Sequence, residues 1–599
     1  MKTRIFQHGR HAAYALIMVM VVAGVASIVL AATLSRSMTN TKMNNRSNQY
    51  SVTMNAAEAA TEKVFARMAY DFQNQGLGAV YGNIGIYRAY IPNEDPYWAN
   101  FEFSDGNGHQ NATYVSLLTN NYTGPLPSQY PGLFTAGAPL YRIISNAKLT
   151  SGSVITGTAQ EDVLLALVPL TQYAIFYNGL LEFSTCATMT VNGRVHANGC
   201  IYTGTSASLT FNGTVTSTGT ISSPSWNGQG PGWSSTGVYN GTPPSRTNVP
   251  SVTLSIGTTN VHGTIDMPPV GEDPTSTIGQ TRMYNQAQAI LLVSNNWVKM
   301  IVQDSINYQV PGADPAPLSI LCTNTPGVLA TNLPFLTLTN TFTDQRESKT
   351  VLATQIDVAK YGQFIRTNST VLTKYPAGSG TYPTILYVAD NRTNNSSQLG
   401  AVRLINGAAP PTNGNLGFTV ATPDPLYVQG HYNCPVPGYL GTTNTTASLP
   451  CALMSDALTI LSSAWSDSQS GNSYTSRSAV DTTVNAAILT GIVPSTGSGS
   501  TQFSGGVHNL PRLLEDWNSP STRTLTLNTA IMNLFYSTQA THMFVNPGTY
   551  YDPPTRKFSY DLNFQDPAKQ PPGVPCALVA IRLNWATPPP NTITYNVSP

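Results

Sequence analysis

The feature that most constrains this chain is an uncharged apolar run near its start. Residues 11–35 contain no Asp, Glu, Lys or Arg, and residues 12–34 are mostly Ala, Val, Leu, Ile and Met. A helix of that length reaches roughly 35 Å, which is enough to cross the hydrocarbon layer of a membrane. We therefore predict a transmembrane helix over residues 12–34, in contact with membrane lipid.

The charges before this run predict its orientation. Lys2, Arg4 and Arg10 lie in a basic leader over residues 1–11, which the positive-inside bias keeps in the cytoplasm. The alternative is a removable signal peptide cut near Ala31 and Ala32. The apolar core of a signal peptide is typically about 7–15 residues, and this run is longer, so an anchor is favoured. We expect inner-membrane anchoring, with the C-terminal body in the periplasm or at the cell surface.

A second helical pattern follows the apolar run. Apolar residues recur every fourth position at Ala56, Ala60, Val64, Met68 and Phe72. This spacing predicts an amphipathic helix that continues the membrane helix over residues 35–75. The helix is expected to end near the glycines at 76 and 78. Together the two parts form one helix of roughly 60 residues, about 90 Å long.

These N-terminal residues resemble a known family. The basic start, Gly9, the Ala15-Leu16-Ile17 sequence and the later Ala56-Ala57-Glu58-Ala59 are similar to the N-terminus of PilX-type minor pilins and related type IV pilus or type II secretion pseudopilins. The resemblance implies an anchoring helix that packs into a filament core. It also implies leader processing between Gly9 and Arg10, and other pilin-like subunits or pilus and secretion assembly proteins as partners.

The composition describes the remainder of the chain. Only 10% of residues are charged, 30 are Tyr, and the net charge is +1. Hydroxyl- and amide-rich surfaces of this kind are typical of secreted β-rich proteins. A balanced charge provides no field that would attract DNA or RNA, so nucleic acid is excluded as an expected partner.

A repeat of 20 residues predicts the fold of the body. Residues 189–193 with Val195, Gly199 and Ile201 match residues 209–213 with Val215, Gly219 and Ile221, and residues 261–265 form a weaker third copy. Short alternating strands between Asn-Gly corners are typical of a parallel β-solenoid. We therefore expect a mainly β protein in which a long N-terminal α-helix precedes a parallel β-solenoid body with an inserted α/β element.

The predicted parts follow one another along the chain. A Gly/Asn/Tyr-rich region, either α/β or a linker, covers residues 79–172, and the first solenoid rungs cover 173–270. The inserted α/β element covers 271–380, and further rungs with a C-terminal cap cover 381–599. Residues 422–428 and 504–512 resemble segments of large pilus-associated or surface proteins of environmental bacteria, which again implies a surface location.

The cysteines leave two interpretations open. Cys186 and Cys200, and Cys434 and Cys451, are close enough in sequence to close short loops by disulfides in an oxidising compartment. Buried free thiols are the alternative for each. None of the six cysteines has the spacing of a zinc site.

Candidate chemical groups are few. Phosphate-binding, zinc-protease and nucleophile-elbow motifs do not occur, so we expect no enzyme and no cofactor. Three groups of ionisable side chains are possible sites, and a simpler structural role is favoured for each. They are Asp344, Arg346, Glu347 and Asp357 as an ion-paired corner; His196 and His262 as a ladder on a solvent face; and His508, Arg512, Glu515 and Asp516 as a polar loop capped by Trp517.

The sequence thus favours a structural or assembly component of the bacterial envelope, pilin-like and anchored in the membrane. A surface adhesin that binds glycans is the alternative. A polysaccharide-processing enzyme is the third possibility, and it depends on analogy with other β-helical folds alone.

Overall fold

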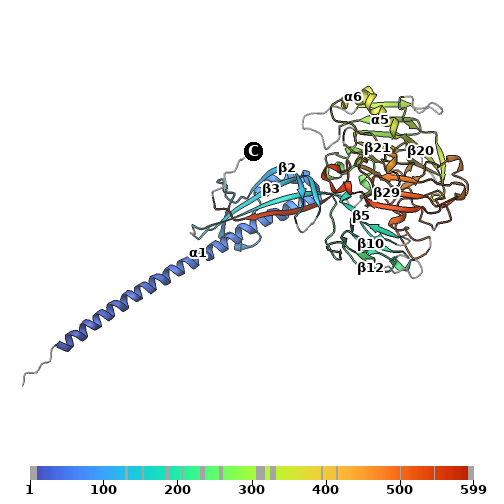
Figure 1. The fold of residues 1–599 in the computed structure, drawn as a ribbon. Coiled ribbons are helices and arrows are strands. Elements are labelled where there is room, and N and C mark those ends of the chain that lie inside the picture. The colour runs from blue at the N-terminus through green and yellow to red at the C-terminus, as the bar shows by residue number, and fades with distance from the viewer. Residues whose placement is uncertain are drawn as a thin grey trace, which may run out of the picture.

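The computed structural model describes residues 10–590, with gaps at 128–131, 152–153, 184–187, 205–206, 230–236, 255–260, 305–317, 324–331, 393–395, 413, 415, 500 and 546. A long helical rod projects from a small sheet, which we call the head, and a large β-rich body lies at the opposite end of the molecule (Figure 1).

The rod is the helix α1, Arg10–Gly82, of 73 residues. At 1.5 Å per residue it measures about 110 Å. Residues 14–48 are exposed along its whole circumference, whereas from Met54 onward one face is buried against the head. The helix is interrupted at Gly76, where φ is 76°, a conformation that glycine tolerates far better than other residues. The chain then re-enters helix as far as Gly82, beyond the end expected from the sequence.

The head is an antiparallel sheet packed under the second half of α1. Its strand order is β1-β3-β4-β32, with β2 also paired to β3. The strands are β1 Phe101–Ser104, β2 Tyr114–Pro125, β3 Phe134–Leu149, β4 Thr156–Pro169 and β32 Cys576–Ala586, and the short helix α2, Ile84–Arg88, follows α1. Because β32 comes from the C-terminal region, the head is completed only after the chain has built the body.

Two small cores hold α1 on the head. One contains Val64, Met68 and Phe72, which pack against side chains of β3 and β4. The other contains Ala57 and Ala60, whose small side chains allow a close approach. The approach is closest at Gly157 of β4, where a Cβ atom would lie 2.4 Å from the backbone nitrogen of Met54. Glycine is therefore required at this position by space.

The body is built around one sheet of twelve strands, whose order is β14-β11-β8-β5-β30-β28-β25-β23-β21-β15-β16-β17. Its strands are β5 Tyr173–Tyr177, β8 Arg194–Ala197, β11 Val215–Ser217, β14 Ser245–Arg246, β15 Ala289–Val293, β16 Trp297–Val302, β17 Leu318–Thr323, β21 Ile385–Asp390, β23 Phe418–Ala421, β25 Cys451–Ser455, β28 Ala487–Thr490 and β30 Ile531–Asn533. Most neighbours are parallel, and β15 is continuously apolar because both its faces are buried.

Smaller sheets complete the body. A six-stranded sheet contains β18 Leu336–Thr337, β19 Thr341–Asp344, β20 Lys349–Asp357, β22 Gln398–Ile405, β24 Leu426–Gln429 and β26 Leu458–Leu461. Three sheets have three strands each: β6 Leu181–Glu182, β9 Ile201–Tyr202 and β12 Ile221–Ser222; β7 Met189–Val191, β10 Leu209–Phe211 and β13 Val238–Tyr239; β27 Thr482–Asn485, β29 Thr524–Thr529 and β31 Thr555–Tyr560. The short helices of the body are α3 Thr277–Thr281, α4 Met283–Gln286, α5 Val358–Thr367 and α6 Ser369–Lys374. One continuous apolar core joins the sheets.

The prediction of a parallel β-solenoid body is wrong. The sheets mix parallel and antiparallel pairs and differ in size, and in the largest sheet the strands are not stacked in chain order. The late strand β30 pairs with the early strand β5, through Ile531 and Ile175, so the chain returns to the middle of the sheet. The strands β15, β16 and β17 form an antiparallel edge.

The 20-residue repeat corresponds to local strand pairing only. Phe211 pairs with Val191 and Val215 with Val195, both in parallel register. The third copy is not a strand, since Val261–Thr264 form a 3₁₀ helix. The expected inserted α/β element is also corrected, because β15 is a member of the twelve-stranded sheet and pairs with β21. Two matching copies were too few to define the architecture of the whole body.

Candidate membrane and assembly interface

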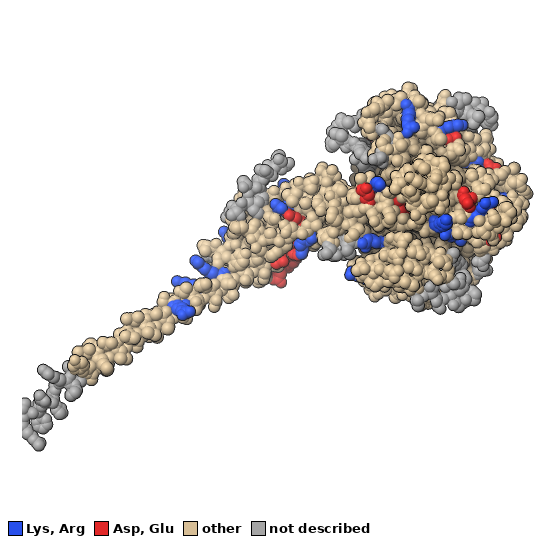
Figure 2. Space-filling model, in the orientation of Figure 1, with Lys and Arg blue, Asp and Glu red and all other residues tan. Residues whose placement is uncertain are grey.

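The exposed half of α1 is the most distinctive surface of the protein. Within the helix a window of 18 residues has a mean hydropathy of 2.7, and none of it is buried against the rest of the chain. Side chains such as Leu16, Val22 and Ile28 are 59%, 65% and 70% exposed. In Figure 2 the outer part of the rod that the structure describes shows neither blue nor red, the colours of basic and acidic residues. A length of about 35 Å of apolar helix requires either lipid or other apolar helices around it.

Two hydroxyl side chains of the apolar segment are hydrogen-bonded within the helix itself. The hydroxyl of Ser27 donates to the carbonyl of Ala23 over 2.7 Å, and that of Thr33 donates to the carbonyl of Leu30 over 2.9 Å. Such bonds remove the need for water at these positions, so the segment is compatible with a lipid environment.

Buried polar contacts fix the inner half of α1 to α2. The carboxylate of Asp71 accepts hydrogen bonds from Tyr87 Oη at 2.8 Å and Asn83 Nδ2 at 3.0 Å, and Arg67 Nε lies 3.1 Å away. Burial and the neighbouring Asp71 raise the pKa of Tyr87, so the phenol stays protonated. These contacts make the amphipathic half of the rod one rigid unit with α2.

Comparisons with known proteins provide one weak likeness. The chain matches no protein-family model and no curated protein sequence. A solved structure, the competence-associated pilin ComZ from Thermus thermophilus, matches over 90% of this chain and 98% of its own length, with 11% identity and a TM-score of 0.22. At that score the likeness carries no argument about the fold of the body.

The residues of the expected leader site and disulfides can be placed only in part. Gly9 and Cys186 lie outside the described residues, and Arg10 is the first residue of α1. Cys434 and Cys451 are buried free thiols, so the bridge suggested by their spacing is not formed in this structure. Cys200 is also a free thiol. Burial raises the pKa of Cys451 to about 12, so this thiol is unreactive at neutral pH.

The charged corner near residue 344 is a buried network. Glu347 Oε1 lies 2.6 Å from Arg512 Nη1, and both side chains are almost fully buried. Asp344 accepts a hydrogen bond of 2.6 Å from Tyr427 Oη, and Arg346 donates to the carbonyl of His542. Burial, followed by the charge of Arg512, lowers the pKa of Arg346 to about 10.

Asp357 lies apart from this network, at the N-terminus of α5, where it accepts a hydrogen bond from the backbone of Lys360.

The group around residue 515 is likewise structural. Both carboxylate oxygens of Glu515 accept hydrogen bonds from Ser462, at 2.6 Å from its backbone nitrogen and 2.7 Å from its hydroxyl. Burial raises the pKa of Glu515 to about 7 and lowers that of His508 to about 3. Trp517 is fully buried rather than a cap over an exposed loop. The side chains of this group are buried.

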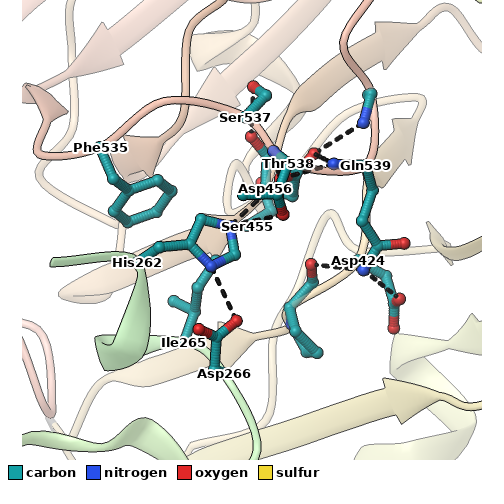
Figure 3. Close-up of polar contacts among 12 residues, drawn as sticks. His262, Ile265, Asp266, Asp424, Ser455, Asp456, Phe535, Ser537, Thr538 and Gln539 are labelled. Atoms are coloured by element: carbon teal, nitrogen blue, oxygen red, sulfur yellow. Dashed lines mark hydrogen bonds and ion pairs between the residues drawn. The ribbon is translucent and has the colours of Figure 1, made fainter. Parts of the chain in front are cut away.

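The expected solvent-face ladder of His196 and His262 is wrong, because both side chains are buried. Figure 3 shows His262 between two carboxylates, with Nδ1 2.7 Å from Asp266 and Nε2 3.2 Å from Asp456, and the ring of Phe535 beside it. Burial disfavours the charged imidazolium, but the two carboxylates outweigh it and raise the pKa of His262 to about 9. The protonated histidine therefore joins the 261–266 segment to the end of β25.

Sequence reasoning missed the partners of His262, and also a neighbouring pair of aspartates. Asp390 is the last residue of β21, and Asp424 follows β23, the parallel neighbour of β21. Both aspartates line a surface cavity of about 520 Å³. Burial and the charge of Asp390 raise the pKa of Asp424 to about 7. Asp390 is held by Arg392 at 2.6 Å, and Asp424 accepts hydrogen bonds from the backbone of Asp390 and from Gln539. No signal in the sequence indicated this juxtaposition, because the two strands meet only in the sheet.

Among the described residues, no group of three or more His, Cys, Asp or Glu side chains is arranged to hold a metal ion. The buried ionic groups connect neighbouring strands and turns. The exposed apolar helix is therefore the surface on which a functional proposal can be built.

Proposed function

We propose that this protein is a membrane-anchored, pilin-like structural subunit of the bacterial envelope, of the minor pilin or pseudopilin type, in a type IV pilus or a related secretion apparatus. One observation carries the proposal: α1 runs continuously from an exposed apolar segment into an amphipathic segment bound to an antiparallel head. The proposal includes no catalytic activity.

The geometry supports anchoring followed by assembly. The apolar segment can lie in lipid before assembly and against the equivalent helices of neighbouring subunits afterwards, because both environments are apolar. The small residues Ala23, Gly24 and Ala26 within it would permit close helix packing. Arg36, Lys42 and Arg46 follow on the exposed helix, and Arg36 lies close enough to the end of the apolar run for its side chain to reach lipid headgroups at the outer surface.

In this proposal the head and body lie outside the cytoplasm. The support is the basic leader before the apolar run and the hydroxyl- and amide-rich composition of the remainder. The body, which is much larger than the head, would then be displayed at the end of the rod, away from the membrane (Figure 1).

Membrane extraction tests the anchor. The full-length protein should resist extraction by alkaline carbonate, and the double variant Val22→Lys/Val25→Lys should become extractable, since each Lys at the centre of a membrane helix costs about 3 kcal/mol. Val238→Lys/Val270→Lys is the matched control, because both valines are exposed on the body. A wild-type chain recovered as a free cytoplasmic protein contradicts the proposal.

The mature N-terminus tests the pilin-like role more finely. We expect mass spectrometry to find Arg10 as the first residue in cells with a prepilin peptidase, and the unprocessed chain in cells without it. An N-terminus that does not depend on the peptidase would exclude the minor pilin and pseudopilin assignments and leave only a membrane anchor.

A further inference from the structure

A cavity of about 520 Å³ lies where the head meets the body. The body contributes side chains from β8, β11 and β14, the head contributes Leu578 and Val579 of β32, and the rod contributes Gln73 of α1. Its volume lies within the range of about 300–1,000 Å³ that is typical of small-molecule sites.

The floor of the cavity is one face of three parallel strands. His196, Thr216 and Arg246 are side by side in the register of β8, β11 and β14. Arg194 and Thr214 lie two residues before His196 and Thr216, and alternate residues of a strand point to the same face. The strand pairing thus gathers these side chains on one surface.

The charge of this cavity is positive. Arg194 and Arg246 both line it, and of the described residues that line it none is Asp or Glu. His196 adds no charge, since burial lowers its pKa. Its Nδ1 lies 2.8 Å from Thr216 Oγ1 and its Nε2 lies 2.9 Å from Asn198 Oδ1. The histidine instead positions the threonine hydroxyl at the floor.

The remaining walls are largely apolar. Leu133, Val249, Pro250, Leu578 and Val579 also line the cavity. A bare inorganic anion would leave these walls in contact with water, whereas a ligand with an apolar part would cover them. An apolar cavity with a few convergent polar groups is the usual form of an organic ligand site.

We propose that this cavity binds a small organic anion whose acidic group pairs with Arg194 and Arg246 and whose apolar part, about one or two rings in size, lies against the Leu and Val side chains. Such a ligand contacts the head and the body together, so its binding stiffens their junction. The inference is independent of the pilin-like role, because it depends on the cavity and not on the exposed helix.

Calorimetric titration of the full-length protein in a non-ionic detergent tests this site, with empty micelles as the blank. The probe is naphthalene-2-sulfonate, compared with its uncharged counterpart naphthalene-2-sulfonamide and with inorganic sulfate. We expect one sulfonate per chain, bound more tightly than either comparison compound. Arg246→Gln and Arg194→Gln should each weaken sulfonate binding about 10-fold, the effect of losing one charge-assisted hydrogen bond.

The matched control is Arg366→Gln, which removes the same charge from α5, outside the cavity. It should leave the affinity for the sulfonate unchanged. Any of three results would overturn the proposal. They are equal affinity for the sulfonate and the sulfonamide, absence of sulfonate binding at millimolar concentration, and equal weakening of sulfonate binding by all three variants. Because Arg246 is exposed, this variant should fold as the wild type does.

Discussion

The hydroxyl of Thr61 on α1 donates a hydrogen bond of 2.8 Å to the carboxylate of Glu161 on β4, a residue 100 positions later in the chain. The other oxygen of Glu161 lies 3.1 Å from Arg582 Nε on β32. One fully buried carboxylate therefore joins the rod, the centre of the head sheet and the C-terminal strand. The rod's attachment depends on contacts of this kind in addition to its apolar face.

Replacing Glu161 should loosen the head. Glu161→Ala removes the acceptor of Thr61 and the buried partner of Arg582, so we expect a loss of about 2 kcal/mol in the free energy of unfolding. Chemical denaturation of the wild type and the variant measures this loss. Glu94→Ala is the control, because Glu94 pairs with Lys63 while 62% exposed, and its removal should change stability little. Equal effects of the two variants would show that the buried contact does not hold the head.

Gly157 should not tolerate a side chain. Gly157→Ala places a methyl group 2.4 Å from the backbone nitrogen of Met54, so α1 must shift away from β4. We expect destabilisation of about 1–3 kcal/mol, measured by the same denaturation. In Gly85→Ala the new methyl group meets nothing within 4 Å, and this variant should be neutral or slightly stabilising. A neutral Gly157→Ala would contradict the close packing of α1 on β4.

The buried ion pair of Glu347 and Arg512 predicts that the effects of replacing these two residues on stability are not additive. Arg512→Met leaves the carboxylate buried without its 2.6 Å partner, and we expect a loss of about 3–5 kcal/mol. Replacing both residues by Met removes the uncompensated charge, so the double variant should be more stable than Arg512→Met. Thermal unfolding of the three proteins measures the difference. A double variant less stable than the single one would show that Glu347 is satisfied without Arg512.

His262 should make stability depend on pH. An unfolded histidine titrates near pH 6.5 and the folded one at about 9, so its stabilisation is complete below pH 6.5 and is lost as the pH rises through 9. His262→Gln should therefore cost roughly 2 kcal/mol at pH 6 and much less at pH 10, after allowance for solvent screening. Denaturation of the wild type and the variant between pH 6 and pH 10 measures this difference in the free energy of unfolding. His542→Gln, at an exposed position, is the control.

The apolar run over residues 12–34 and the four-residue spacing from Ala56 to Phe72 were sufficient by themselves to predict the long helix and the face that it buries. Both signals are local, because an uninterrupted helix satisfies its own backbone hydrogen bonds and its periodicity depends on neighbouring turns alone. The mainly β character of the remainder was also readable from its strand-forming composition.

Only the tertiary structure decided how the strands combine. The pairing of β30 with β5 joins Ile531 to Ile175, and the solenoid prediction failed because two copies of a repeat do not specify contacts between such distant segments. The same reason explains why the sequence did not predict the contacts of His262 or the cavity that Arg194 and Arg246 line. Asp456 meets His262 because the 3₁₀ helix Val261–Thr264 lies against the residue that follows β25, and Arg246 joins Arg194 in one cavity because β14 and β8 both lie beside β11. The 20-residue repeat matches the pairing of β8 with β11, but no local pattern indicates the contacts of His262 or Arg246.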